Sequence, residues 1–334
     1  MKQIIPYLLI LAFLFCACEK NVEIEDGGDR EWVLNGVPST GKQAFVYFAN
    51  TRFFLDSSNN QPVDGATLTL TVNGQPYSPV SEVRCRYYFP HILQENDSLA
   101  IDIVAGDRRV HAETYLPPVP DIRGFQPRKF ASSSFNFYTV DFRLTDHANR
   151  KEYYNVTVSV RDSGMRYNAW GDSLEYVDTV RQTYFLVPYN PEITSNEVNP
   201  YIPLGGYLYS RIMFTDDLID GQRDPIALYI INTVDTNERA PFKHEYFVQV
   251  ESVTPARWNY IISSSQQAGS FSLFAEQGSV WTNVEGAYGI FAGTSNVRFA
   301  FDPDTLSPAT MPSAMPRTLP TGQHTTPPAK MLIY

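Results

Sequence analysis

The sequence predicts an all-β protein, and three observations support this. Tyr and Phe, which favour strands, occur 21 times each, while charged residues make up only 19% of the chain. Apolar and polar residues alternate through much of the chain, as in Thr67–Val72. A Pro-rich segment separates two such regions, and 334 residues are enough for two domains with sizeable cores.

Residues 31–116 predict a small β-sandwich. Thr67–Val72 is a strand with one apolar face, and Asn73-Gly74 directly after it is a strong hairpin signal, because both residues tolerate positive φ. The expected strands are 32–34, 43–50, 67–72, 83–89, 98–104 and 108–116. This spacing is typical of a sandwich of the immunoglobulin-like or transthyretin-like type.

A Pro-rich linker, 117–122, leads into a larger β-rich domain, 123–301, with one short helix. Pro117-Pro118-Val119-Pro120 favours a stiff, extended connection. Thr254-Pro255 is typical of a helix N-cap followed by Pro in the first helical position, and the helix is expected to end near Gly269. The expected strands of this domain are 135–144, 153–160, 226–231 and 244–253.

The two ends of the chain are expected to lie outside the folded domains. Residues 1–17 predict a lipoprotein signal peptide, because the apolar run Ile4–Phe15 is too short to span a bilayer and Ala17 places a small residue before Cys18. Cys18 is then the lipidated residue; Cys16 and an ordinary signal peptide are the alternatives. Residues 18–30 predict an acidic tether, and the Pro/Thr-rich segment 302–334 a flexible tail.

Charge and cysteine content narrow the classes of partner. The net charge is −10 and no Lys/Arg cluster occurs, which argues against nucleic acid or an anionic membrane surface as the partner. Membrane attachment is expected through the lipid anchor on Cys18. Beyond the signal peptide only Cys85 remains, so no intrachain disulfide is expected.

The aromatic, Pro-punctuated segment from Tyr167 to Tyr209 is the candidate recognition region. Tyr and Trp present rigid apolar faces with a polar atom, which suits protein partners and small or oligomeric ligands. The same rings could instead close a core between irregular strands. The candidate binding residues are Tyr167, Trp170, Tyr184 and Tyr201.

The residues predict no enzyme and no cofactor. The tetrapeptide Gly171-Asp172-Ser173-Leu174 matches one esterase signature, but the α/β context and the base that would activate its Ser are missing from the sequence. The five histidines are scattered, which gives a zinc site little support. Asp216, Asp217 and Asp220 form an oxygen-rich cluster, either a solvated turn between strands or a calcium site whose spacing differs from an EF-hand.

The sequence contains, in this order, the segments Trp32–Gly36, Pro62–Ala66, Phe214–Gly221, Trp258–Tyr260 and Thr282–Phe291. Together they resemble a family of Bacteroidota lipoproteins catalogued as domain of unknown function 4249. The acidic stretch behind Cys18 is also similar to the export signal that carries Bacteroidota lipoproteins to the outer face of the outer membrane. The family resemblance runs from Cys18 to about Phe301, and the tail departs from it.

The resemblance implies an outer-membrane lipoprotein, lipid-anchored and facing the cell exterior. It also implies a TonB-dependent β-barrel receptor as the partner, for which the protein would be a non-catalytic binding or accessory subunit in nutrient import. The alternative is a structural or adhesive surface lipoprotein without a transport role. The resemblance carries over no catalytic residue. Gly286 and Gly289 around Tyr288 suit a strand edge or bulge.

Overall fold

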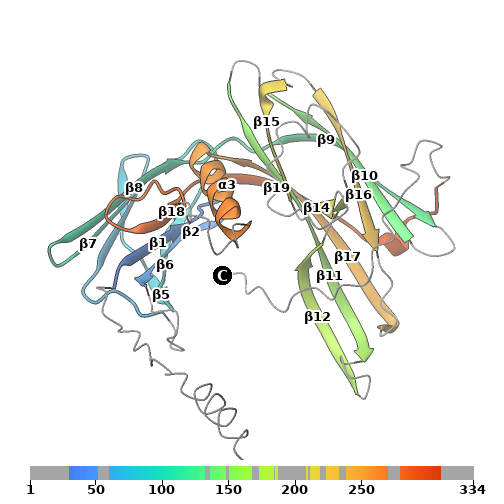
Figure 1. The fold of residues 1–334 in the computed structure, drawn as a ribbon, viewed down its shortest axis with the longest axis horizontal. Coiled ribbons are helices and arrows are strands. Elements are labelled where there is room, and N and C mark those ends of the chain that lie inside the picture. The colour runs from blue at the N-terminus through green and yellow to red at the C-terminus, as the bar shows by residue number, and fades with distance from the viewer. Residues whose placement is uncertain are drawn as a thin grey trace, which may run out of the picture.

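The protein is all-β, with two cores, each enclosed by a pair of sheets (Figure 1). The computed structural model describes residues 30–51, 60–131, 136–147, 150–167, 173–183, 185–186, 208–209, 211–218, 223–232, 238–269 and 279–309. Among these residues the strands far outnumber helical segments, which confirms the predicted fold class.

The first domain is a β-sandwich. One sheet has the strand order β18-β1-β2-β6-β5, and the facing sheet the order β4-β3-β7-β8. The bounds of these strands are β1 Trp32–Gly36, β2 Gln43–Asn50, β3 Thr67–Val72, β4 Gln75–Tyr77, β5 Ser81–Val83, β6 Arg86–Ile92, β7 Ser98–Ala105, β8 Arg108–Tyr115 and β18 Tyr288–Phe291. Assignment to an immunoglobulin-like or transthyretin-like type stays a prediction.

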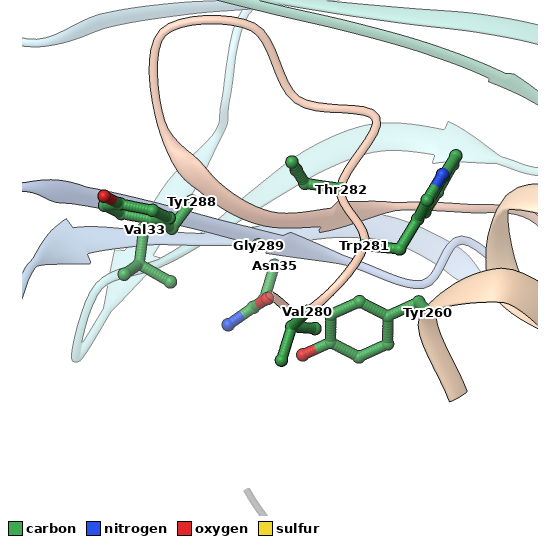
Figure 2. Close-up of a pocket in the computed structure, with 8 residues that line it drawn as sticks. All are labelled: Val33, Asn35, Tyr260, Val280, Trp281, Thr282, Tyr288 and Gly289. Carbon is green, nitrogen blue, oxygen red and sulfur yellow. The ribbon is translucent and has the colours of Figure 1, made fainter. Parts of the chain in front are cut away.

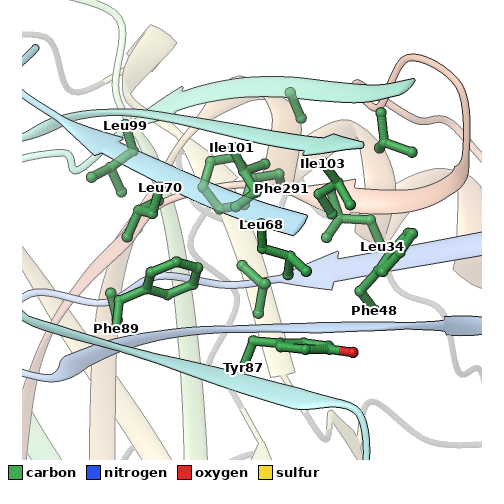
Figure 3. Packing of buried hydrophobic residues seen from close by; sticks show 14 of the residues in the cluster. Leu34, Phe48, Leu68, Leu70, Tyr87, Phe89, Leu99, Ile101, Ile103 and Phe291 are labelled. Atoms are coloured by element: carbon green, nitrogen blue, oxygen red, sulfur yellow. The ribbon is translucent and has the colours of Figure 1, made fainter. Parts of the chain in front are cut away.

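Alternation along the strands builds the first core. Leu68, Leu70 and Val72 of β3 are buried, while the residues between them are more exposed, as the two-residue period of a strand requires. Figure 3 shows Ile101 and Leu70 of one sheet meeting Phe48 and Phe89 of the other. Packing between the inner faces of two sheets therefore holds this domain together.

The second domain also places its core between two sheets. Their orders are β14-β13-β16-β10-β9 and β12-β11-β17-β19, with β15 paired to β11. Buried residues of β10 and β16 face those of β11 and β17, among them Val140, Leu228, Val158 and Val248. The bounds are β9 Asp121–Ala131, β10 Asn136–Thr145, β11 Tyr153–Tyr167, β12 Leu174–Gln182, β13 Phe185–Leu186, β14 Leu208–Tyr209, β15 Arg211–Thr215, β16 Arg223–Asn232, β17 Glu238–Val253 and β19 Thr294–Phe301.

The chain returns from the second domain to complete the first sheet. β18 pairs with β1 in parallel, with Val33 opposite Tyr288 and Gly36 opposite Phe291, and Phe291 belongs to the first core. The sequence places this segment in the second domain, 123–301. The structure differs because the apolar side chains of 284 and 291 are buried in the first sandwich. Only Ala292 and Gly293 then separate β18 from β19 of the second domain.

Helix α3, Pro255–Gly269, confirms the predicted short helix and lies between the two domains beside β18 (Figure 1). Thr254 caps it, since its Oγ1 accepts a hydrogen bond from the Arg257 N–H at 3.4 Å. Tyr153 of β11 contacts Trp258 with 5.4 Å between ring centroids, which holds the helix against the second domain. No helix in the described ranges is long and apolar enough to cross a membrane.

Three local predictions differ from the structure. The expected strand 83–89 is split by a turn at Arg84 and Cys85, whose φ angles are +50° and +65°. The segment after Asp162, which lacks clear alternation in the sequence, forms the β11–β12 hairpin. Residues 302–309 of the expected flexible tail are ordered, because Leu306 packs against the second core and the Ala309 N–H donates to the Lys129 carbonyl.

Candidate functional site

The candidate site lies where the returning segment meets β1 and α3, and Asn283 shapes this segment. The Asn283 Oδ1 accepts from the Phe291 N–H at 3.0 Å, and its Nδ2 donates to the Phe291 carbonyl at 2.7 Å and to the Glu113 carbonyl at 3.1 Å. One amide thus closes the loop between residues 283 and 291 and attaches it to β8. This gives a structural role to the Thr282–Phe291 motif.

Glycines allow the returning segment to approach the first sandwich closely. Gly289 has φ +116°, and a Cβ built there would overlap the Leu34 carbonyl of β1. Gly286 has φ +80°, and its Cβ would overlap the Arg109 carbonyl. The prediction of a strand edge or bulge is confirmed for Gly289, which lies in β18, the edge strand of its sheet, whereas Gly286 lies two residues before that strand.

A pocket of about 280 Å³ opens at this junction (Figure 2). Elements from both domains contribute to it, since β1 and β18 belong to the first sandwich and α3 is joined to β17 of the second domain by Thr254. In Figure 2 the Tyr288 ring lies against Val33, and Tyr260 and Val280 lie beside Asn35. The lining residues are Val33, Asn35, Tyr260, Val280, Trp281, Thr282, Tyr288 and Gly289.

The wall of the pocket is mostly apolar and aromatic, with one unsatisfied acceptor. The Asn35 Oδ1 is buried and has no hydrogen-bond partner among the residues that the structure describes. Trp281 is held against α3, because its backbone N–H donates to the Ser263 Oγ at 2.9 Å. Tyr288 is 62% exposed although it is a large aromatic residue. An aromatic wall with a single buried acceptor can bind a small ligand that has an apolar face and an N–H or O–H donor.

Of the four predicted recognition residues the structure describes Tyr167, which is not among the residues that line this pocket. Tyr167 is the last residue of β11, half-buried and opposite Leu174 of β12. Trp170, Tyr184, Tyr201 and the lipidation residue Cys18 lie outside the described residues. The motifs that resemble the family are the part of the sequence that could have indicated this pocket. Four of the lining residues belong to those motifs: Asn35, Tyr260, Thr282 and Tyr288.

Asp216 and Asp217 bind groups of the protein itself. The Asp216 Oδ2 accepts from the Glu152 N–H at 2.7 Å, while Asp217 accepts from the Lys151 Nζ at 2.7 Å and from the Thr215 Oγ1 at 2.8 Å. Asp220 lies outside the described residues. In the described part of the chain, no three His, Cys, Asp or Glu residues are grouped so as to hold a metal ion.

The pKa values of the two neighbouring carboxyl groups, Asp216 and Asp217, are shifted in opposite directions. Burial raises the pKa of Asp216, whereas the hydrogen bonds from Lys151 and Thr215 lower the pKa of Asp217. The pair joins the end of β15 to the start of β11. Calcium binding at this turn stays a hypothesis.

These features define a class of protein: an all-β molecule of two packed domains with a small, aromatic-lined pocket at their junction. The chain belongs to the family described as Domain of unknown function (DUF4249), which it matches over residues 19–299. No curated protein matches the chain.

Three solved structures show weak similarity to the chain. A structure of manganese lipoxygenase of Gaeumannomyces graminis with part of zonadhesin of Komagataella pastoris has 11% identity and a TM-score of 0.18, covering 67% of this chain and 89% of that chain. A putative membrane anchored protein from Corynebacterium diphtheriae has 10% identity and a TM-score of 0.17, covering 68% and 55%. Collagen adhesin from S. aureus has 8% identity and a TM-score of 0.19, covering 81% and 93%. Such low TM-scores give no basis for transferring a fold or an activity.

Proposed function

We propose that the protein is a surface-exposed outer-membrane lipoprotein that acts, without catalysis, as a binding or accessory subunit of a TonB-dependent nutrient import receptor. The pocket at the domain junction is the observation that carries the binding role. Its aromatic walls come from Tyr260, Trp281 and Tyr288, and its buried Asn35 Oδ1 has no hydrogen-bond partner in the described part of the chain. The outer-membrane location and the receptor rest on the family resemblance and on the Ala17-Cys18 pattern.

The pocket favours a ligand portion about the size of one ring. Its volume of about 280 Å³ lies just below the usual range of ligand pockets, roughly 300 to 1,000 Å³. The Asn35 Oδ1 can only accept, so a ligand that donates a hydrogen bond there is preferred over one of the same shape that cannot. A larger ligand would insert one such group and leave the rest outside.

Phenol and toluene test this chemistry, because they share a ring and differ in the O–H donor. Ligand-observed NMR should show phenol binding more tightly to the purified protein. Trp281→Ala should abolish the signal, and Asn35→Leu should remove the preference for phenol. Tyr176→Ala is the control, since Tyr176 is an exposed ring on β12 that lies outside the pocket. Equal binding of phenol by the wild type and by Trp281→Ala would exclude this pocket as the site.

Lipidation at Cys18 is tested separately. Cys18→Ser should abolish labelling with a fatty-acid analogue and release the protein from the membrane fraction. Protease added to intact cells should cut the wild-type protein if Glu23, Glu25 and Asp26 act as part of an export signal. Unchanged labelling of Cys18→Ser would contradict lipidation at Cys18.

The receptor is tested by affinity purification from gently solubilised outer membranes. A large β-barrel should copurify with the tagged protein. Tyr167→Ala, Trp170→Ala, Tyr184→Ala and Tyr201→Ala should weaken that association if these rings contact the receptor. Folded variants that retain the barrel would exclude the four rings as the contact, and a wild-type protein that purifies alone would contradict the import role.

The alternative, a structural or adhesive surface protein, is favoured by the exposed face of β12. Leu174, Tyr176 and Val180 are large apolar residues on one side of this edge strand, exposed by 50%, 68% and 60%. Exposed apolar residues on an edge strand are typical of a contact with another protein. Replacing all three with Ser should reduce cell-to-cell or cell-to-surface attachment under the adhesive role. Under the import role the same variant should leave attachment unchanged.

A further inference from the structure

The edge strand β12 has one unpaired side. It pairs with β11 and with no other strand among the described residues, and Figure 1 shows it at the lower end of the second domain. Seven of its nine residues are exposed, and only Val177 is buried. The unpaired side of β12 therefore offers a row of backbone N–H and C=O groups, which is a template for another strand.

Three exposed charges on β12 restrict which strand can pair with it. They belong to Glu175, Asp178 and Arg181. Like charges directly opposite each other destabilise a strand pair, so a suitable partner strand presents opposite charges at the matching positions. A second copy of β12 does this for Glu175 and Arg181 when the two strands run antiparallel and are centred on Asp178.

This register matches both faces of the strand. Glu175 lies opposite Arg181 of the second copy, and the two-fold symmetry produces this contact twice. On the other face Tyr176 lies opposite Val180, and aromatic residues pair favourably with β-branched ones across strands. Asp178 is the middle residue of β12, so the same register pairs all nine residues.

The neighbouring registers match less well. Centred on Val177, the strands place Glu175 opposite the neutral Thr179. Centred on Thr179, they place Arg181 opposite the apolar Val177. Neither arrangement brings opposite charges together, so the sequence of β12 favours the register centred on Asp178.

The charges of β12 also have partners within one copy. Arg166 of β11 donates to Glu175 at 3.3 Å, and Arg181 donates to Asp162 of β11 at 2.6 Å. Across the two copies the row would read Arg166, Glu175, Arg181, Asp162, with the sign alternating at each step. The pairs within each copy and the pairs between copies therefore support one another.

The two Asp178 carboxylates would face each other at the centre of the contact. Each is already held by Arg161 of β11, whose Nε and one terminal nitrogen donate to the two carboxylate oxygens, both at 2.8 Å. This bidentate pair has no net charge. The centre of the contact therefore joins two neutral ion pairs, and the repulsion of two unpaired carboxylates is avoided.

We propose that two copies of the chain form a symmetric dimer by pairing their β12 strands, antiparallel and centred on Asp178. The β12-β11-β17-β19 sheet of one copy then continues into the same sheet of the other. Tyr176 and Val180, exposed by 68% and 60% in one copy, supply apolar surface to the contact. This dimer goes beyond the proposed role in import and does not depend on it.

Disulfide cross-linking tests the register. The full chain is used in mild detergent with Cys16→Ser and Cys18→Ser, so that the buried Cys85 is the native thiol that remains. Asp178→Cys should form a disulfide-linked dimer on mild oxidation. Tyr176→Cys and Val180→Cys should cross-link only when mixed, because each lies about 13 Å along the strand from its own symmetry mate, beyond the reach of a disulfide.

Charge reversal tests the same contact without cysteines. In sedimentation equilibrium Glu175→Lys should weaken the dimer at least about tenfold, because two attractive contacts become repulsive. Mixing Glu175→Lys with Arg181→Glu should restore a dimer of one copy of each. Glu113→Lys is the matched control, since it makes the same charge change on an exposed side chain of β8 and should dimerise as the wild type does.

Three results would each overturn the proposal. The first is a wild-type chain that stays monomeric at all concentrations. The second is cross-linking of Tyr176→Cys alone to the same extent as its mixture with Val180→Cys. The third is an equal dimerisation constant for the wild type, Glu175→Lys and Glu113→Lys.

Discussion

At the scale of residues, two buried aspartates of the second domain have opposite effects on stability. Burial alone would raise the pKa of Asp162, but hydrogen bonds from the His244 Nδ1 at 2.8 Å and the Arg181 Nε at 2.6 Å outweigh it and lower this pKa. For Asp216 burial dominates, and its pKa is raised. The same residue type therefore stabilises the fold at neutral pH in one place and opposes it in the other.

Asp162→Asn should destabilise the protein by about 1–3 kcal/mol at neutral pH, because a buried charged acceptor with two partners is lost. The folded-state pKa of Asp162 lies below its ordinary value of 3.8, so its contribution is present above that value. The contribution is lost as the pH falls through the folded-state pKa. Urea denaturation across pH should thus show the difference between variant and wild type narrowing below pH 4. A constant difference would contradict the pairing.

Asp216→Asn should be neutral or stabilising at pH 7, because Asn keeps an oxygen for the Glu152 N–H and removes the buried charge. The pKa of Asp216 is raised, so the wild type recovers this stability as the pH falls and the advantage of the variant disappears in acid. The same variant tests the calcium hypothesis. If calcium binds at this turn, the wild type should melt at a higher temperature with calcium than with a chelator, and Asp216→Asn should not.

At the scale of elements, β18 lies so close to β1 that only a glycine fits at position 289. Gly289→Ala should cost at least about 2–3 kcal/mol, because the backbone is strained and the Cβ overlaps the Leu34 carbonyl, so β18 must shift from β1. Gly65→Ala is the matched control, since Gly65 also has positive φ, +67°, but no atom lies within 4 Å of its Cβ. The control should cost only about 1 kcal/mol. Equal losses of unfolding free energy in Gly289→Ala and Gly65→Ala, measured by denaturant titration, would contradict a role for the close approach of β18 to β1.

Local patterns predicted those elements whose signals are contained in adjacent residues. The strands Gln43–Asn50 and Thr67–Val72, the Asn73-Gly74 turn and the helix from Pro255 to Gly269 all depend on such signals, and the structure confirms them. β12 was missed because it is an exposed edge strand, where packing does not select alternating apolar residues. The turn at Arg84 and Cys85 was missed because neither residue favours positive φ.

The candidate site could not be assembled from the sequence in the same way. Asn35 and Tyr288 line one pocket because β1 and β18 pair in parallel, and parallel pairing across the chain leaves no local pattern. The motif around Thr282–Phe291 marked the segment but not its partner.

At the scale of the whole molecule, the junction between the domains is short and hydrogen-bonded. The Gly293 N–H donates to the Thr114 Oγ1 at 2.9 Å, and the Ser295 Oγ donates to the Pro117 carbonyl. The Val119 N–H donates to Glu95 at 3.2 Å, which holds the Pro-rich linker to the first sandwich. The chain passes between the domains three times, and two of these connections, the Pro-rich linker and Ala292-Gly293, are fixed by such bonds, which restricts the relative motion of the domains.

The first sandwich should not be stable as a contiguous fragment. Residues 30–122 lack β18, and Phe291 is 1% exposed in the first core. We expect this fragment to be partly unfolded by circular dichroism and to gain structure when a peptide of residues 279–293 is added. A Phe291→Ser peptide is the control and should have little effect. A cooperative unfolding transition of the fragment alone, unchanged by either peptide, would show that the returning segment is dispensable.

The parallel pairing of β1 with β18 also sets the order of events during biosynthesis. About 250 residues separate the two strands, so a ribosome adding roughly 5–20 residues per second delivers the partner tens of seconds after β1 has been made. Throughout that interval β1 is an unprotected sheet edge, open to pairing with another nascent chain. Newly made copies should therefore depend on holding chaperones until translation is almost complete, and the amino-terminal sandwich, although synthesised first, is closed last.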